Sequence, residues 1–214
     1  FQWNVAGTWQ EAKRSRYFTG AYEQLQGRPV HQDLHAQPSV VIGLRRDPVP
    51  EIGEVSLRYV VTQVIPPDDV HRLAEMQIVA SMQPLHATSD YQMADRYWGD
   101  RCVAAYAWRS LLDAGTVLAF GLVCPVEDLD PFQGIHAAVT RRRANGDPGP
   151  EGWHPEQKLT VHEAVYAYTM GAAFASGEEQ LKGSLTAGKL ADLVILDRDI
   201  FDIDPMDILH TRVH

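Results

Sequence analysis

The chain has 214 residues and a formal net charge of −9, from 28 acidic and 19 basic side chains. With 45% hydrophobic and 22% charged residues, its composition is typical of a globular protein large enough to bury one sizeable core. The acidic balance argues against nucleic acids and anionic membrane surfaces as main partners.

Two cysteines, Cys102 and Cys124, are too few for a disulfide framework, and their spacing fits no zinc motif. We therefore expect free thiols in a reducing compartment and predict a cytoplasmic protein. No apolar run approaches the ~18 residues that a membrane span needs, and residues 1–18 lack the apolar centre of a signal peptide.

The amino-terminal part, residues 1–54, is the hardest to interpret. Residues 8–27 are rich in aromatic side chains and are consistent with a helix, whereas SVVIGLRR at 39–46 predicts a strand. Proline-rich stretches flank that strand. We expect this segment to hold one strand and one helix.

From residue 55 onward, predicted strands alternate with predicted helices. β-Branched runs indicate the strands, and proline, glycine and acidic residues mark where the helices begin and end. The predicted order is strand 55–65, helix 66–76, strand 77–84, helix 101–115, strand 116–121 and helix 130–144. This alternation is typical of βαβ units, so we predict an α/β fold with a parallel sheet over residues 55–176.

The carboxy-terminal part changes in character. A helix is expected over 159–176, where Thr160 and Glu163 form a capping-box pattern. Residues 177–214 then contain two short strand signals around a turn at Ala187-Gly188, with no helix between them. This pattern predicts a small antiparallel β segment outside the βα layer.

Several segments, in unbroken order from about residue 55 to 214, resemble amidohydrolase family 3. This is the N-substituted formamide deformylase-like branch of the amidohydrolase superfamily. The segments that carry the resemblance are SMQPLHATSD (81–90), AYAWRSLLDAG (105–115), CPVEDLDPFQGIHAAVTRR (124–142), LTVHEAVYAYTMGAAFA (159–175) and GSLTAGKLADLVILDRD (183–199). The resemblance covers only the carboxy-terminal part of the family. It implies a partial TIM-type (β/α) barrel holding the sixth to eighth strands, followed by a segment of a small β-sandwich.

The resemblance also implies an activity and a cofactor. Family members hydrolyse amide-type C–N bonds of small molecules with water activated by a divalent metal. We expect zinc, because histidine and carboxylate ligands suit it.

Two frames of the family lack their functional residues here. In the family, the eighth strand ends with the motif Gly-Ser-Asp-(Ala or Cys)-Pro-Val-Glu, whose Asp is a metal ligand and proton shuttle. Residues 121–127 keep this motif, except that Leu122 and Val123 replace Ser and Asp. In the sixth strand, residues 60–62 replace Glu-His-Ala, so Val61 stands where the family has a ligand histidine. Two hypotheses follow: a hydrolase or part of one, and an inactive relative that keeps the fold as a binding or assembly module.

Three histidines are the remaining candidates for chemistry. His86 follows strand 77–84, where the family keeps a histidine near the substrate, so we predict a catalytic or binding role; the alternative is a solvated loop histidine. His35, and with it His31, could be the remnant of a metal ligand after the family's fifth strand, or part of a surface loop.

The front half of the barrel, with its paired histidines, has no counterpart in the sequence. An eight-fold barrel alone takes about 250 residues. We therefore expect a fragment, one piece of a split protein or a shortened relative. Because part of a barrel exposes strand edges and apolar faces, we expect either a partner, as a second copy or a complementing chain, or a rearranged sheet.

Overall fold

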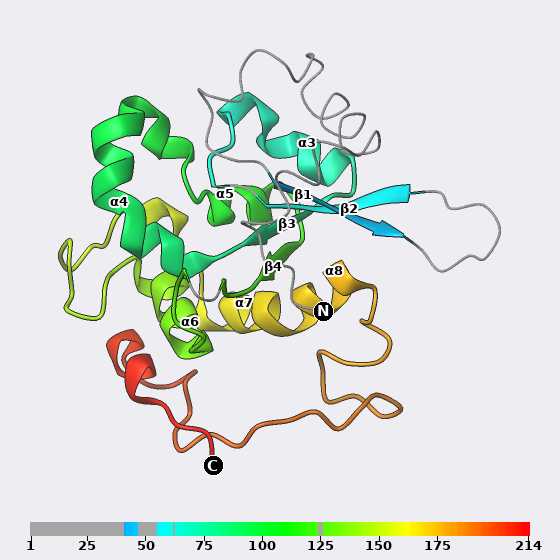
Figure 1. Ribbon diagram of the computed structural model, residues 1–214. Helices are drawn as coiled ribbons and strands as arrows, with labels where there is room; N and C mark the ends of the chain where they lie inside the picture. Colours follow the sequence, from blue (N-terminus) through cyan, green and yellow to red (C-terminus); the bar gives the residue numbers. More distant parts are fainter. Residues whose placement is uncertain (1–40, 47–54, 62, 124–125) are drawn as a thin grey trace.

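The computed structural model describes residues 41–46, 55–61, 63–123 and 126–214 (Figure 1). His31, His35 and the helix expected at 8–27 lie outside the described residues. The strand expected at 39–46 is confirmed as β1, Val41–Arg46.

A four-stranded sheet forms the centre of the molecule, in the order β1, β2 (Val55–Val61), β3 (Val79–Met82) and β4 (Leu118–Phe120). β1 pairs with β2 in the antiparallel sense, whereas β2, β3 and β4 are parallel. The three strands predicted after residue 55 are therefore confirmed, as is their parallel pairing.

Helices connect the strands and cover the sheet. In the view of Figure 1, α3 and α5 lie above the sheet and the continuous segment α7–η4–α8 lies below it, while α4 packs against α6 at one end. Their bounds are η1 Pro67–Asp69, α3 Val70–Glu75, α4 Pro84–Trp98, η2 Gly99–Ala104, α5 Trp108–Asp113, α6 Pro131–Thr140, η3 Pro155–Gln157, α7 Val161–Tyr166, the π-helix η4 Ala167–Gly171, α8 Ala172–Ser176 and η5 Pro205–His210. Within the described residues, no helix is long and apolar enough to cross a membrane.

The expected capping box of α7 is confirmed. The Thr160 N–H donates to Glu163 Oε2 at 2.8 Å, and the Glu163 N–H donates to Thr160 Oγ1 at 3.2 Å. Glu163 also binds the guanidinium of Arg109 in α5, which lowers the pKa of the glutamate to about 2. The same residue thus begins α7 and ties it to α5.

The prediction of a single helix over 101–115 is wrong. The chain forms η2, leaves helical geometry at Tyr106, where φ is 50°, and starts again as α5. At the break, the backbone forms hydrogen bonds with a distant segment. The Tyr106 N–H donates to Gln63 O at 2.6 Å, and the Ile65 N–H donates to Ala104 O at 3.2 Å. Backbone pairing with residues 63–65 therefore outweighs the local helical pattern.

Arg141, directly after α6, is buried. A positive side chain after the end of a helix suits the helix dipole from the surface, but the structure turns Arg141 inward with only 1% of its surface exposed. Its guanidinium carbon lies 4.4 Å from the centre of the Trp108 ring and 5.0 Å from that of Trp153. The side chain also donates to the carbonyls of Trp153 and Tyr106, at 2.7 and 2.9 Å. Burial lowers the pKa of Arg141 to about 9.

The outer edge of β4 is covered by a helix. The Ala80 N–H donates to Val117 O at 2.9 Å, so the next carbonyl, that of Leu118, points away from β3. Gly171 of η4 lies against it so closely that a Cβ at position 171 would be 2.0 Å from Leu118 O. The sheet is therefore open, and α7–η4–α8 shields its β4 edge.

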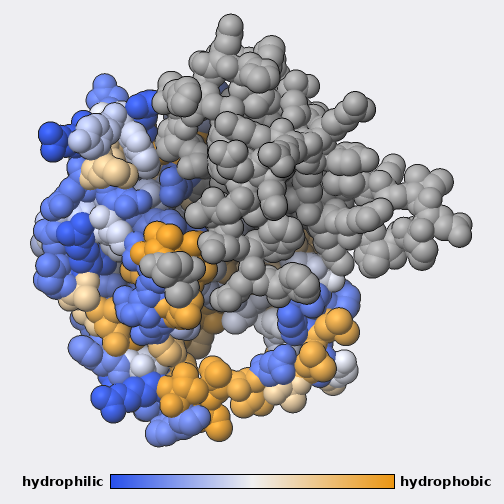
Figure 2. Space-filling model, viewed as in Figure 1, coloured by the Kyte–Doolittle hydropathy of each residue, from blue (hydrophilic) through white to orange (hydrophobic). Residues whose placement is uncertain are grey.

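The tail differs from the small antiparallel sheet that was expected. The turn at Ala187-Gly188 forms, with the Lys189 N–H donating to Thr186 O at 3.1 Å, but residues 177–214 contain only one isolated bridge, Leu196 to Val213. In the stretch where strands were expected, Leu185, Leu190, Leu193, Val194 and Ile195 remain exposed. Figure 2 shows hydrophobic residues along the bottom of the molecule. Pairing is limited to residues 195–197 and 212–214, where the Asp197 N–H donates to Arg212 O at 3.0 Å and the His214 N–H donates to Ile195 O at 2.9 Å.

Candidate functional site

The carboxyl ends of three parallel strands meet at one edge of the sheet. Their register aligns Val61 at the end of β2 with Ser81 of β3, and Ser81 with Ala119 of β4. In α/β proteins, the groups that follow such aligned strand ends form the binding crevice. This edge, with the residues directly after β3 and β4, is the candidate site.

His86 lies at this edge, in the first turn of α4. Pro84 occupies the first turn as well, and the His86 N–H donates to Gln83 O at 3.1 Å. Its ring is half-buried, and the Nε2 atom is buried without a hydrogen-bond partner in the described part of the chain. A buried ring nitrogen without a partner is costly unless a ligand or water meets it. His86 thus lies in a helix and not in a loop, and its role in binding or catalysis stays a prediction.

Asp90 and Tyr106 hold the helix that carries His86. Asp90 lies four residues after His86, on the same face of α4, and its Oδ2 accepts a hydrogen bond from the Tyr106 hydroxyl at 2.9 Å. The pKa of Tyr106 is raised, mainly by burial and also by the nearby Asp90. Its hydroxyl therefore stays protonated and donates the hydrogen bond. The sequence analysis missed both residues; the spacing of four between His86 and Asp90 was the available signal.

The segment that follows β4 is apolar. Leu122 and Val123 are half-buried, and Val126 and Leu129 are exposed. Glu127 is half-buried, and its N–H donates to Val123 O at 2.9 Å, which closes a turn after the strand. The side chains nearest the end of β4 can exclude water or contact an apolar group, but they cannot bind a metal or transfer a proton.

The described residues do not form a metal site. Among residues 63–123 and 126–214, no group of three or more His, Cys, Asp or Glu side chains could hold an ion. His86 stands there without a second ligand, and the two histidines predicted as ligands, His31 and His35, lie outside the described residues. The described donor set at this edge therefore does not fit a divalent metal, and His31 and His35 as ligands stay a prediction.

Comparisons with known proteins give consistent results. The model of the amidohydrolase family matches residues 41–214. The protein YtcJ of Bacillus subtilis (strain 168) is 34% identical over 152 residues, which are 71% of this chain and 28% of YtcJ. The N-substituted formamide deformylase of Arthrobacter pascens is 37% identical over 94 residues, which are 44% of this chain and 17% of that enzyme.

Two solved structures of uncharacterized metal-dependent hydrolases are similar in fold. The one from Pyrococcus horikoshii OT3 has a TM-score of 0.60 and 27% identity, and covers 68% of this chain and 29% of its own. The one from Pyrococcus furiosus has a TM-score of 0.55 and 30% identity, and covers 66% of this chain and 28% of its own. The chain thus spans between 17% and 29% of each of the four proteins.

Proposed function

Because the chain belongs to the amidohydrolase family, we propose that it is the carboxy-terminal part of a metal-dependent hydrolase that cleaves amide-type C–N bonds of small molecules. The observation that carries this proposal is His86. It lies at the edge where the parallel strands end, and its Nε2 is buried without a partner among the described residues. A substrate carbonyl or amide nitrogen would supply the missing hydrogen bond.

In this proposal, His86 binds the substrate and holds or moves a proton at Nε2, with Asp90 and Tyr106 fixing the helix that carries it. Leu122 and Val123 exclude water from one side of the bound molecule. We assign no step to a metal, since the described residues do not form its site. Zinc as the metal, with His31 and His35 as ligands, remains part of the proposal, as does a partial TIM-type barrel in which these strands are the sixth to the eighth.

A second candidate function is an inactive relative that binds the same class of small molecule without cleaving it. The end of β4 favours it, because Val123 stands at the position where the family has the aspartate that shuttles a proton. Apolar side chains at such a position avoid the cost of burying a charge that has no metal partner.

Metal analysis of the purified chain distinguishes the two. If the chain is a hydrolase part, it should hold about one tightly bound zinc or similar ion per chain. His31→Ala and His35→Ala should then lose the ion, whereas His86→Ala should keep it and lose binding of the substrate.

A folded chain that takes up no ion from added zinc would instead support the inactive relative. An ion that survives both His31→Ala and His35→Ala would reject those residues as ligands. The thermal midpoint of each variant, compared with that of the parent chain, provides the control for folding.

A further inference from the structure

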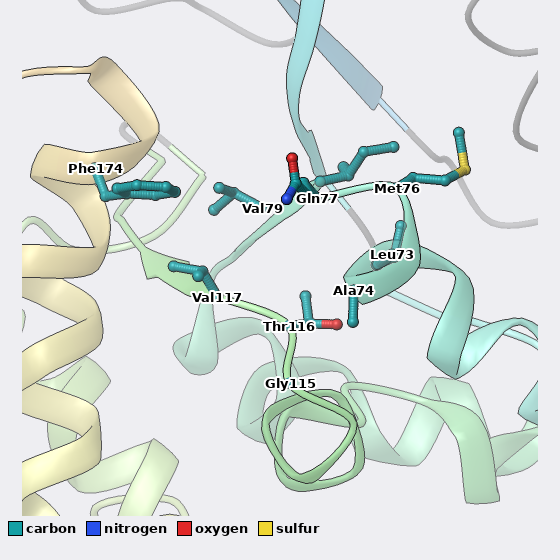
Figure 3. Close-up of a pocket in the computed structure, with 10 residues that line it drawn as sticks. Leu73, Ala74, Met76, Gln77, Val79, Gly115, Thr116, Val117 and Phe174 are labelled. Atoms are coloured by element: carbon teal, nitrogen blue, oxygen red, sulfur yellow. The ribbon is translucent and has the colours of Figure 1, made fainter.

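A cavity of about 650 Å³ opens at the other end of β3 and β4 (Figure 3). Its walls are the segments 76–79 and 115–117, which lead into the two strands, together with α3 and Phe174 of α8. Because β3 and β4 are parallel, their amino-terminal ends share one edge of the sheet and their carboxyl ends the other. The cavity is thus separated from His86 by the length of the strands.

None of the described residues that line this cavity is charged, although the chain as a whole has a net charge of −9. The Phe174 ring, 37% exposed, points toward Val79 and Val117, whereas the Met76 side chain points away from it (Figure 3). A concave, mostly apolar wall of this volume is typical of a site for a small organic molecule. Charged ligands are disfavoured, because no lining side chain would offset their desolvation.

Gln77 provides a polar group in this apolar surrounding. Its φ is 54°, in the left-handed region that glycine adopts without strain and that other residues occupy at a conformational cost. The turn after α3 holds it there: the Gln77 N–H donates to Ala74 O at 3.0 Å and the Ile78 N–H to Leu73 O at 2.8 Å. Gln77 is exposed, and its side-chain amide, which lines the cavity (Figure 3), makes no hydrogen bond with the described residues.

We propose that this cavity is a second binding site, for a small uncharged molecule with an aromatic ring and one hydrogen-bonding group. The ring packs on Phe174, Val79 and Val117, and its polar group meets the Gln77 amide. The site shares no residue with the candidate site at His86, so the proposal is independent of whether the chain is a hydrolase.

Fluorine NMR titration of the full 214-residue chain tests the proposal, with 4-fluorobenzyl alcohol as the neutral probe and 4-fluorobenzoate as its anionic counterpart. The neutral probe should bind saturably, and the anion at least about tenfold more weakly. Gln77→Gly removes the amide and relieves the backbone, so it should weaken binding about three- to tenfold without lowering the thermal midpoint. Val117→Phe fills the cavity and should abolish saturable binding.

His86→Ala is the control for the position of the probe, and it should leave the affinity unchanged. The proposal is overturned if the neutral probe shows no saturation, if the anion binds equally well, or if Val117→Phe, folded by circular dichroism, still binds. Loss of binding in His86→Ala alone would place the probe at the other end of the strands and also reject the proposal.

Discussion

Two buried threonines have opposite hydrogen-bond environments. Thr116, 2% exposed, has a hydroxyl without a partner in the described part of the chain, whereas the Thr140 hydroxyl donates to His136 O at 2.8 Å and accepts from the Arg142 N–H at 3.1 Å. Removing an unpaired buried hydroxyl relieves a desolvation penalty, whereas removing a paired one leaves its partners unsatisfied.

We predict that Thr116→Val raises the free energy of unfolding by up to about 1 kcal/mol and that Thr140→Val lowers it by about 1–3 kcal/mol. Urea denaturation followed by circular dichroism measures both changes under the same conditions. An equal loss in the two variants would mean that Thr116 has a partner in solution, such as an ordered water.

At the scale of elements, the contact between η4 and β4 depends on a single glycine. A Cβ at position 171 would meet the backbone carbonyl of Leu118 at 2.0 Å, and backbone cannot move aside as a flexible side chain can. Gly171→Ala should therefore lower the free energy of unfolding by about 3 kcal/mol or more, because the helix must separate from the strand edge.

Gly121→Ala is the matched control for this change, since a Cβ there meets nothing within 4 Å. Its free energy of unfolding should stay within about 0.5 kcal/mol of the parent chain. If Gly171→Ala were equally harmless, α7–η4–α8 would not cover the β4 edge in solution.

The elements that sequence predicts best are those whose signals are local. The strands 55–65 and 116–121 and the capping box of Thr160 and Glu163 are visible in neighbouring residues, and the structure contains all of them. Helix α4 was not predicted, although Ala87, Tyr91 and Ala94, which the structure buries, recur at helical spacing and were the available signal. The break at Tyr106 depends on residues 63–65, about forty positions away, so no local pattern could reveal it.

The candidate site was predictable to a similar extent. The position of His86 after a predicted strand pointed to the carboxyl edge of the sheet, where the structure has it. That its Nε2 is buried without a partner, and that Asp90 reaches Tyr106, depend on how α4 packs in three dimensions. His31 and His35 remain predictions, because they lie outside the described residues.

At the scale of the whole molecule, residues 185–195 are the part of the tail whose apolar side chains the described residues leave exposed. Val194 lies in a stretch of apolar residues and is 65% exposed, whereas Ile208 of η5, which packs on α6, is fully buried. We propose that residues 177–214 complete a small β-sandwich with strands of a complementing chain. Without such strands, the apolar stretch is free to pair with the same stretch of another copy.

The proposal predicts that the isolated chain self-associates through this stretch and that Val194→Lys reduces the association. Sedimentation velocity over a series of concentrations measures it. The thermal midpoint of Val194→Lys should not change, because Val194 is 65% exposed, whereas Ile208→Ala should lower the free energy of unfolding by about 2–5 kcal/mol. If Val194→Lys unfolds as easily as Ile208→Ala, the tail is already packed within the monomer, and complementing strands are not needed.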